Sequence, residues 1–557
     1  MTNTSSLTLD SVTYALPDGR LLFSNLTERF DQRRTGLVGR NGVGKSILAR
    51  LMAGQLEPSD GRCLRQGRVH YLAQQPITSR TTVADLAQVR QVIEALQRIE
   101  AGSTAASDFE AVGERWNIRE QLHSHLAREQ LGMLRWDRPA ETLSGGQAMR
   151  VALLGAFLGD ADYLILDEPT NHLDAPSRAA LMIMLERWNK GLLVISHDRT
   201  LLASMQRIVE LSPSGLHSYG GDYSAFTACK ARDTELAERN LERLKLERQR
   251  QARDLQRQHE RLERHQARAG HEARHSNQAK ILLDRQQQRS EATAGRQQRN
   301  HLATRQAMDT QVREAAQRLD PQQPVVLHAP ARQLPPGSQI AWLRDLELPH
   351  IEHPHALDLV LYVGQRLALT GANGSGKSTL LKVLAGQLPP RKGECETRAS
   401  VAYLDQQCSL LDPSVCVLEH VREACRELDQ SSVRTRLAQL GLDADRITLP
   451  SGLLSGGERL KAALAAVLYS DQPAQLLLLD EPSNHLDLPS LQALEQMLCQ
   501  YQGTLLVASH DLVFLQHLQL QGQLCMPQSE LHGFGDAQGG KTTAQGEVVM
   551  GDDGLGA

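Results

Sequence analysis

The 557-residue sequence predicts an α/β fold in which two similar domains are joined by a long α-helical linker. A glycine-rich loop pattern, GxxxxGK followed by Ser, occurs twice, at residues 39–46 and 371–378. Later in each copy, a short aliphatic run ends in Asp-Glu, and such runs are typical of buried parallel strands. Between the copies, residues 227–320 contain no proline and no aromatic residue, so this segment predicts long exposed helices.

The spacing of the motifs indicates an internal repeat. The two glycine-rich loops lie 332 residues apart, and so do two similar segments that begin at Tyr71 and Tyr403. Two Leu-Ser-Gly-Gly motifs, which begin at Leu143 and Leu454, lie only 311 residues apart. The first copy therefore carries about 21 extra residues, roughly within residues 80–135.

These features divide the chain into four parts. We expect a first domain over residues 1–226, a basic helical linker over 227–320, a second domain over 321–527 and a disordered tail over 528–557. Prolines end the linker, whereas the tail is rich in glycine and polar residues. Sparse leucines at helical spacing predict a weakly paired coiled-coil hairpin that turns within residues 269–277.

The glycine-rich loop predicts a phosphate site because strand-like runs precede it and helix-forming runs follow it in both copies. Backbone N–H groups of such a loop surround phosphate oxygens, and the next helix adds its positive N-terminal end. The lysine supplies a charge, and the hydroxyl after it, on Ser46 or Ser378, binds Mg²⁺. The residues assigned to nucleotide binding in the two loops are Gly39, Asn41, Gly42, Gly44, Lys45, Ser46, Gly371, Asn373, Gly374, Gly376, Lys377, Ser378 and Thr379.

Two adjacent carboxylates end the aliphatic run of each copy. We expect Asp167 and Asp480 to bind Mg²⁺, and we expect Glu168 and Glu481 to orient and deprotonate an attacking water. Acidic residues after a strand are also common helix caps. The matching distance of both pairs from a phosphate loop favours the catalytic interpretation.

The Ser-Gly-Gly motifs precede helix-forming runs and predict a second phosphate-binding helix N-terminus in each copy. Within one copy this would duplicate the phosphate loop. The motif has a use if the copies face head to tail, so that each completes the site of the other. The residues assigned to this role are Ser144, Gly145, Gly146, Ser455, Gly456 and Gly457.

This set of motifs resembles that of the ATP-binding cassette superfamily, over about residues 7–226 and 338–520. The resemblance implies two ABC-type P-loop NTPase domains that bind ATP and Mg²⁺. It also assigns roles to three further pairs of residues. Gln74 and Gln406 would contact Mg²⁺ and the attacking water, and His197 and His510 would contact the γ-phosphate. Asp174 and Asp487 would act across the two domains.

Both copies continue as Asn-His-Leu-Asp after the catalytic glutamate, and a long linker joins them without a membrane domain. This combination resembles the ABC-F family, soluble translation factors that bind the ribosomal E site and reach toward the P-site tRNA. The resemblance implies an ATPase with two composite sites that works as a monomer in the cytoplasm. It also implies that the insertion within residues 80–135 is the arm, and that residues 227–320 face tRNA and ribosomal RNA.

The charge of the linker supports a nucleic-acid partner. Residues 243–305 contain 16 Lys and Arg and 7 Asp and Glu, whereas the whole chain has a net charge of −4. A basic rod on an acidic body suits RNA phosphates, and the lack of aromatic residues favours backbone contacts over base readout. The alternative interpretation is a solvated spacer whose charges only keep it soluble.

Two other function classes remain open at this stage. A tandem ATPase that powers a membrane transporter is expected to have a short linker. A DNA-repair or chromosome ATPase would carry coiled coil or zinc modules inside a cassette, and the sequence has no zinc pattern, so we expect no DNA partner. The sequence also lacks an apolar run near 18 residues, a secretory signal and paired cysteines, so a soluble intracellular protein with reduced thiols is expected.

The sequence offers one candidate for the adenine-binding residue. Tyr14 lies 31 residues before Lys45 and could stack on adenine, although core packing is as plausible. Its positional counterpart in the second copy is Leu346. Glu458 replaces the usual glutamine of the signature motif, and both copies keep the lysine, aspartate and glutamate of a competent site.

Overall fold

The computed structural model describes residues 5–73, 81–171, 173–275, 303, 306–316, 335, 337–351, 355–484, 486–526 and 530–533. They form two compact units, of which one contains both copies of the repeat and ends its first segment at Tyr223. The other unit, Ser224–Gln322, is the linker. We call the described residues up to Tyr223 the first cassette and those from 335 onward the second cassette.

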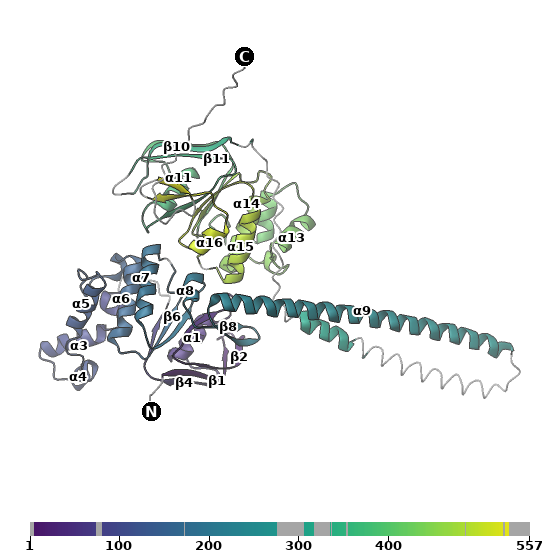
Figure 1. Cartoon of the computed structure of the whole chain (residues 1–557), viewed down its shortest axis with the longest axis horizontal. Helices are drawn as coiled ribbons and strands as arrows, with labels where there is room; N and C mark the ends of the chain where they lie inside the picture. Colours follow the sequence, from purple (N-terminus) through teal and green to yellow (C-terminus); the bar gives the residue numbers. More distant parts are fainter. Residues whose placement is uncertain are drawn as a thin grey trace, which may run out of the picture. The chain divides into compact units, whose positions relative to one another are not determined.

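Each cassette contains a β-sheet with helices around it (Figure 1). Both large sheets have six strands in the same order. The order is β5-β6-β7-β3-β8-β9 in the first cassette and β14-β15-β16-β12-β17-β18 in the second. The first five strands of each order pair in parallel, and the last strand pairs antiparallel. The strands of these sheets are β3 (Arg34–Val38), β5 (Val69–Leu72), β6 (Tyr163–Asp167), β7 (Gly191–Ile195), β8 (Arg207–Ser212), β9 (Gly215–Gly220), β12 (Arg366–Gly371), β14 (Val401–Leu404), β15 (Leu476–Asp480), β16 (Thr504–Ala508), β17 (Gly522–Met526) and β18 (Glu530–Gly533).

A smaller antiparallel sheet covers one face of each large sheet, and α1 or α11 lies between them in the core. The small sheets have the orders β2-β1-β4 and β11-β10-β13. Their strands are β1 (Ser6–Ala15), β2 (Leu21–Phe30), β4 (Asp60–Gln66), β10 (Gln339–Glu347), β11 (Leu357–Tyr362) and β13 (Lys392–Thr397). In the first cassette, Leu9 of β1, Leu37 of β3 and Leu48 of α1 are fully buried in one apolar cluster. Burial of such side chains stabilises the layer by roughly 1.5–3 kcal/mol for each residue.

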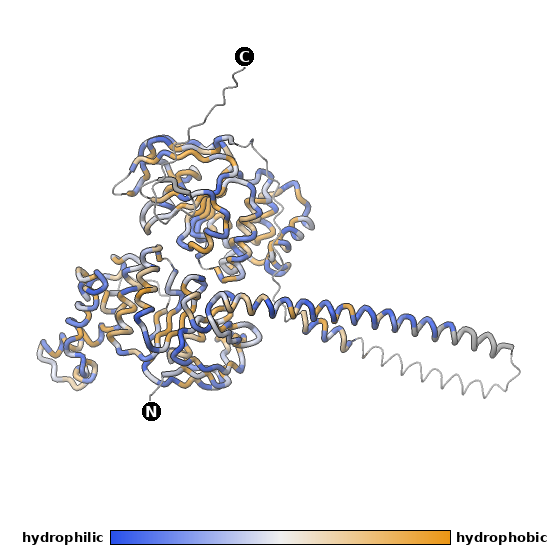
Figure 2. Tube along the Cα trace, in the orientation of Figure 1, coloured by the Kyte–Doolittle hydropathy of each residue, from blue (hydrophilic) through white to orange (hydrophobic). Residues whose placement is uncertain are grey.

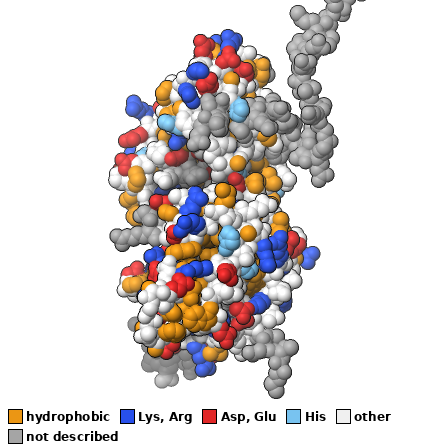
Figure 3. Space-filling model, turned by 90° about the vertical axis from the view of Figure 1, so that its left-hand side faces the viewer, with side chains coloured by type: hydrophobic (Ala, Val, Ile, Leu, Met, Phe, Trp, Pro, Cys, Tyr) orange, Lys and Arg blue, Asp and Glu red, His pale blue; other side chains and the backbone are white. Residues whose placement is uncertain are grey.

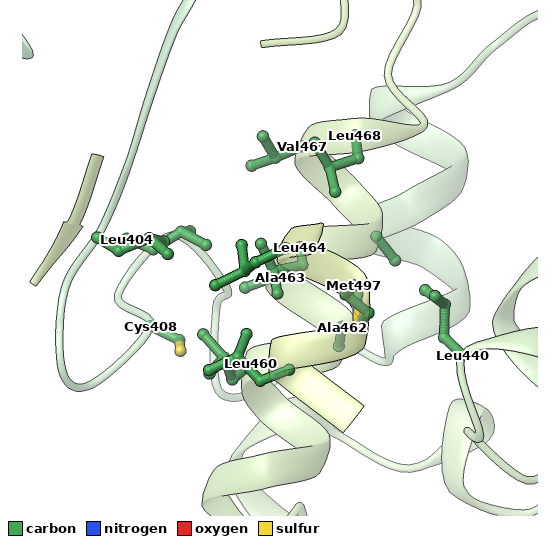
Figure 4. Packing of buried hydrophobic residues seen from close by; sticks show 14 of the residues in the cluster. Leu404, Cys408, Leu440, Leu460, Ala462, Ala463, Leu464, Val467, Leu468 and Met497 are labelled. Carbon is green, nitrogen blue, oxygen red and sulfur yellow. The ribbon is translucent and has the colours of Figure 1, made fainter. Parts of the chain in front are cut away.

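Helices cover the remaining faces. Those of the first cassette are α1 (Lys45–Ala53), α2 (Val83–Leu86), α3 (Arg90–Glu100), α4 (Ala106–Val112), α5 (Ile118–Arg128), η1 (Ala140–Thr142), α6 (Gly145–Leu158), α7 (Ala175–Arg187) and α8 (Arg199–Ala203). Those of the second are α11 (Lys377–Leu384), α12 (Val417–Ala424), α13 (Gln430–Gln439), η2 (Arg446–Thr448), η3 (Ser451–Leu453), α14 (Gly456–Leu468), α15 (Leu488–Gln500) and α16 (Leu512–His517). Figure 4 shows how α14 buries Leu460, Leu464 and Leu468 in the second cassette, with Met497 of α15 beside them. Figure 2 shows the same pattern as hydrophobic segments inside each cassette.

The extra residues of the first cassette form the helix pair α3 and α4. Residues 87–117 separate α2 from α5, whereas residues 425–429 separate α12 from α13 in the second cassette. Ala95 and Leu96 of α3 pack against Val112 of α4, and Arg98 pairs with Asp108 at 2.8 Å. Figure 3 shows the left-hand side of the view in Figure 1, where hydrophobic side chains lie among charged ones. The exposed apolar residues between α4 and η1 include Trp116 and Met133, and Phe109 of α4 is also exposed.

The linker contains one continuous helix, α9 (Tyr223–His275). It is hydrophilic over most of its length (Figure 2). We expected a turn from residue 269, but the helix continues through Gly270 to His275, since a single glycine costs a helix only about 1 kcal/mol. The rest of the expected turn lies outside the described residues. Residues 306–316 are helical again, and Arg248 of α9 approaches Asp309 at 3.4 Å, as a helical hairpin requires.

Two further expectations concern the end of the chain and the cysteines. We expected disorder from residue 528, but Glu530–Gly533 form β18 and pair antiparallel with β17, which supplies backbone partners to an otherwise open sheet edge. The later tail residues lie outside the described part. All eight cysteines are free. No helix among the described residues is long and apolar enough to cross a membrane.

Candidate active sites

Both phosphate loops connect a central parallel strand to a helix. β3 leads into α1, and β12 leads into α11, as the sequence predicts. Gly44 precedes α1 with φ of 102°, a conformation that favours glycine, and a Cβ there would lie 2.6 Å from Leu22. The loop therefore needs glycine for both its backbone and its contact.

The two loop lysines point back into their own loops. Lys45 Nζ donates to the carbonyl oxygens of Gly39 at 2.7 Å and Arg40 at 3.1 Å, and Lys377 makes the equivalent bonds to Gly371 at 2.9 Å and Ala372 at 3.1 Å. Burial lowers the pKa of both lysines, and the nearby carboxylates oppose that effect. The ammonium groups are thus held where they can approach a bound anion.

Each aspartate at a strand end has one oxygen bonded and one oxygen without a partner. The Tyr71 hydroxyl donates to Asp167 Oδ2 at 3.1 Å, and the Tyr403 hydroxyl donates to Asp480 Oδ2 at 3.1 Å. In both aspartates the buried Oδ1 has no hydrogen-bond partner among the described residues. Such an oxygen is costly unless it is bonded, and beside the hydroxyl of Ser46 it suits a divalent cation such as Mg²⁺.

The glutamates that follow lie beside histidines of the neighbouring strand. Asp167 of β6 is in register with Ile195 of β7, so Glu168 and His197, which follow, lie at the same sheet edge. Glu168 Oε1 lies 3.4 Å from His197 Nε2, and the corresponding distance from Glu481 to His510 is 3.5 Å. The parallel register therefore explains why residues 29 apart in sequence meet.

Burial sets the protonation of these pairs. It raises the pKa of Glu168, and it raises the pKa of Glu481 to about 7. It lowers the pKa of His197 to about 3 and that of His510 to about 4, with help from the positive lysines. The imidazoles are neutral at physiological pH, and the carboxyl group of Glu481 titrates near neutrality.

Both glutamates also have left-handed backbone conformations. The φ angle is 49° at Glu168 and 49° at Glu481, a conformation that is uncommon for residues other than glycine. Each amide remains bonded, because Glu168 N donates to Ile195 O at 2.9 Å and Glu481 N donates to Ala508 O at 2.8 Å. A strained backbone conformation that the surrounding hydrogen bonds hold in place is typical of functional sites.

The two sites differ in how they hold the histidine. His510 Nε2 lies 3.1 Å from Lys377 Nζ and 3.0 Å from Asn373 Oδ1. The ring nitrogens of His197 have no hydrogen-bond partner among the described residues. In the second cassette the loop lysine therefore engages the histidine directly, and in the first it does not.

The aspartates expected to act across the domains contact the opposite phosphate loop. Asp487 caps α15 by accepting from Ser490 N at 3.0 Å, and its other oxygen accepts from Asn41 N at 2.8 Å. Asp174 caps α7, and its Oδ2 accepts from Asn373 N at 3.2 Å. The cassettes thus face each other with each aspartate against the loop of the other cassette.

The Ser-Gly-Gly motifs begin α6 and α14, as predicted. Ser144 and Ser455 are the N-caps, and each side chain accepts a hydrogen bond from the backbone N–H of Gln147 or Glu458. The side chain of Gln147 or Glu458 accepts in turn from the backbone N–H of the serine. A cavity of about 490 Å³ has Lys45, Glu168 and other residues of the first site on one wall and residues of the second cassette, among them Asn484, on the other. Ser455 and Gly457 do not line this cavity, so their approach to a nucleotide stays a prediction.

The remaining assigned residues have mixed outcomes. Gln74 lies outside the described residues, and Gln406 follows β14 with an exposed side chain. Tyr14 is half-buried, and its ring centroid lies 6.2 Å from that of Phe23. Leu346 is fully buried, so no adenine platform exists at that position of the second cassette.

Several residues of the sites were missed by sequence reasoning. The hydroxyls of Tyr71 and Tyr403 hold the aspartates, and their equal spacing from the two phosphate loops was the available signal. Arg178 was also missed: it lines the cavity and pairs with Asp198 at 3.2 Å. Its counterpart in the second cassette is Leu491, so only a comparison of the two copies could have drawn attention to it.

Comparison with known proteins gives the family. The ABC transporter family model matches residues 28–171 and 354–484. The ATP-binding protein YdiF of Bacillus subtilis (strain 168) is 30% identical over 527 residues, which cover 87% of this chain and 74% of YdiF. The chain belongs to the ABC-F family. This ABC-F protein is also 29% identical to the ribosome protection protein VmlR of Bacillus subtilis (strain 168), over 92% of this chain and 85% of VmlR.

Solved structures agree with this ABC-F protein in fold. The archaeal ribosome recycling factor aABCE1, solved in complex with the ribosomal stalk protein aP1, matches with a TM-score of 0.57 at 19% identity. The match covers 94% of this chain and 90% of that chain. A structure titled RNase-L Inhibitor matches with a TM-score of 0.55 at 18% identity, over 94% of this chain and 91% of that chain.

Proposed function

We propose that this ABC-F protein hydrolyses ATP at two composite sites and acts in the cytoplasm on the ribosome. The observation that supports the ATPase most strongly is that each cross-acting aspartate, Asp174 or Asp487, bonds the opposite phosphate loop. Neither cassette then has a complete site alone. One site would use Lys45, Glu168 and His197, and the other would use the equivalent residues of the second cassette.

The residues present can take the roles that hydrolysis needs. When bound, Mg²⁺ would neutralise phosphate charge, and Ser46 with Asp167 would hold it in the first site, as Ser378 with Asp480 would in the second. The lysines add positive charge at the phosphates. A carboxyl group with a pKa of about 7, as at Glu481, can both accept a proton from water and release it near neutral pH.

The proposed ribosomal partner rests on the linker and on the relatives. The segment 243–305 is strongly basic, and α9 carries exposed arginines such as Arg248, Arg257 and Arg264 along its length. Such a helix can contact the phosphates of ribosomal RNA and of the P-site tRNA. The printed name of VmlR, a ribosome protection protein, agrees with a ribosomal role.

Ribosome co-sedimentation tests this proposal. The protein carries Glu168→Gln and Glu481→Gln, so that ATP is held, and Gln replaces five linker residues: Arg264, Arg268, Arg274, Lys280 and Arg285. The side chains of Arg268 and Arg274 and all of Lys280 and Arg285 lie outside the described part of the structure. We expect weaker binding and a shallower salt dependence, by about one unit of slope for each lost phosphate contact.

A control variant replaces three exposed cassette arginines, Arg33, Arg62 and Arg398, each of which pairs with a nearby carboxylate. The control should bind ribosomes as the parent does. Equal binding and equal salt dependence in the linker variant would show that the linker is only a spacer. Recovery of the protein with membranes instead of ribosomes would favour the alternative, an ATPase subunit that energises a transporter.

A further inference from the structure

A buried ion pair joins the two cassettes at one point. Arg199 is the first residue of α8, and Glu495 lies in α15 of the second cassette. Arg199 Nη1 donates to Glu495 Oε1 at 2.7 Å, and Nη2 donates to Oε2 at 3.3 Å. Only 6% of Arg199 and 8% of Glu495 are exposed. His517 extends the cluster, with Nδ1 3.0 Å from Glu495 Oε2.

This ion pair occurs once, although the cassettes are copies. The repeat offset of 313 residues places Leu512 at the position of Arg199, and Leu512 is 58% exposed. The same offset places Met182 at the position of Glu495. No charge is therefore available for the symmetric bond. The contacts of Asp174 and Asp487, by contrast, are made on both sides.

The geometry makes the pair a strong constraint on cassette register. Two parallel N–H to oxygen bonds fix both distance and orientation, and loss of one partner would leave the other charge buried and unpaired. Burial is the largest influence on the pKa of Arg199 and lowers it, but the hydrogen bond and negative charge of Glu495, together with Tyr223 and Asp511, raise the pKa overall. The two cassettes thus contact each other directly at this point, through their own side chains.

The pair also bears on neighbouring functional elements of the same unit. Arg199 follows His197 by two residues, so fixing the start of α8 fixes the segment that carries this histidine. Tyr223, the first residue of α9, also hydrogen-bonds to Arg199. In the second cassette, Leu512 offers no such anchor, and His510 is bonded to Lys377 and Asn373. Of these two site histidines, His197 is the one whose segment is anchored and whose ring nitrogens have no hydrogen-bond partner among the described residues.

We propose that Arg199 and Glu495 form a one-sided latch that holds the cassettes in register before ATP binds and positions His197, so that the Lys45 site takes ATP at lower concentration than the Lys377 site. Arg199 is a positioning residue here, because it acts through His197. Apparent affinity scales with the population of the binding-competent arrangement, and the latch raises that population at one site. The second half of this inference rests on the proposed function.

Amide hydrogen exchange of the nucleotide-free full chain tests the latch itself. Arg199→Gln removes the guanidinium, and Glu495→Gln keeps the size of its side chain but removes the charge. Exchange in α8 and α15 should become about tenfold faster or more in each variant. Leu512→Gln and Met182→Gln, at the equivalent positions, are the matched controls and should exchange as the parent does.

Circular dichroism shows whether each variant folds. If Arg199→Gln does not fold, the exchange of Glu495→Gln alone tests the latch. Exchange within about twofold of the parent in a folded variant overturns the latch.

Equilibrium ATP binding then tests the positioning of His197. With Lys377→Ala only the Lys45 site reports, and with Lys45→Ala only the Lys377 site reports. We expect Glu495→Gln to raise the Kd about tenfold at the Lys45 site and less than about twofold at the Lys377 site. Equal shifts at both sites overturn the positioning role. If neither site of the parent binds ATP, the proposed function fails, and the exchange experiment still decides on the latch.

Discussion

Replacement of Gly146 by Ala should disturb both the first cassette and its contact with the second. A Cβ built on Gly146 would lie 2.5 Å from the Cβ of Ser177, about 1 Å less than an ordinary carbon–carbon contact. Ser177 is in the first turn of α7, and its amide donates to Asp174 Oδ1 at 3.1 Å. Movement of Ser177 therefore moves Asp174, which bonds the phosphate loop of the second cassette at Asn373.

The expected magnitude follows from the size of the clash. Overpacking of this kind costs typically about 1–3 kcal/mol. For a domain of roughly 200 residues this corresponds to a decrease of about 2–12 °C in Tm. Gly145→Ala is the matched control: Gly145 is the exposed neighbour in the same turn of α6, so alanine there should leave Tm unchanged or slightly higher.

A double variant separates the clash from other effects of alanine. Ser177→Gly removes the obstructing atoms and by itself costs about 0.5–1 kcal/mol of helix stability. Thermal unfolding of the full chain should show Gly146→Ala with Ser177→Gly to be more stable than the sum of the single variants, by about 1 kcal/mol or more. Strict additivity, or a Gly146→Ala variant with the Tm of the parent, would refute the packing argument.

Two further predictions concern the glutamates. Glu168→Gln with Glu481→Gln should lower phosphate release by about 10²- to 10⁴-fold while ATP binding persists, and an unchanged rate would remove these residues from the role of general base. Burial raises the pKa of Glu481 to about 7 in the folded protein, so the folded state holds this proton more tightly than the unfolded state does. The bound proton therefore adds to the free energy of unfolding at low pH, and this contribution is lost as pH rises from about 4.5 to about 7. Glu481→Gln removes that dependence, so the nucleotide-free variant should gain up to roughly 3 kcal/mol relative to the parent across this range in urea unfolding, and a constant difference would contradict the shift.

The residues of short motifs were predictable because their chemistry is local. A glycine with φ of 102° before α1, a lysine in the loop and a carboxylate at the end of β6 each follow from a few neighbouring letters. The parallel sheet then brings these residues together, because the carboxyl ends of parallel strands lie at the same edge of the sheet. The contact between Glu168 and His197 follows from this rule alone.

The buried ion pair between the cassettes was not predictable in this way. Arg199 and Glu495 lie 296 residues apart, and no motif marks either one. The available signal was a difference between the copies, namely a charge in one and an apolar residue in the other. The presence of β18 and the continuation of α9 through Gly270 also depend on context. Pairing with β17 orders β18, and the helix-forming residues around Gly270 keep α9 continuous.

The latch has a consequence for which halves can associate. If two molecules paired through their first cassettes, Arg199 of one would meet Met182 of the other and stay buried without a counter-charge. Pairing through two second cassettes would leave Glu495 opposite Leu512. Only the unlike combination satisfies the charges, and this combination is already present within one chain. The duplicated halves have thus become complementary rather than interchangeable, and the interface itself disfavours exchange of halves between molecules.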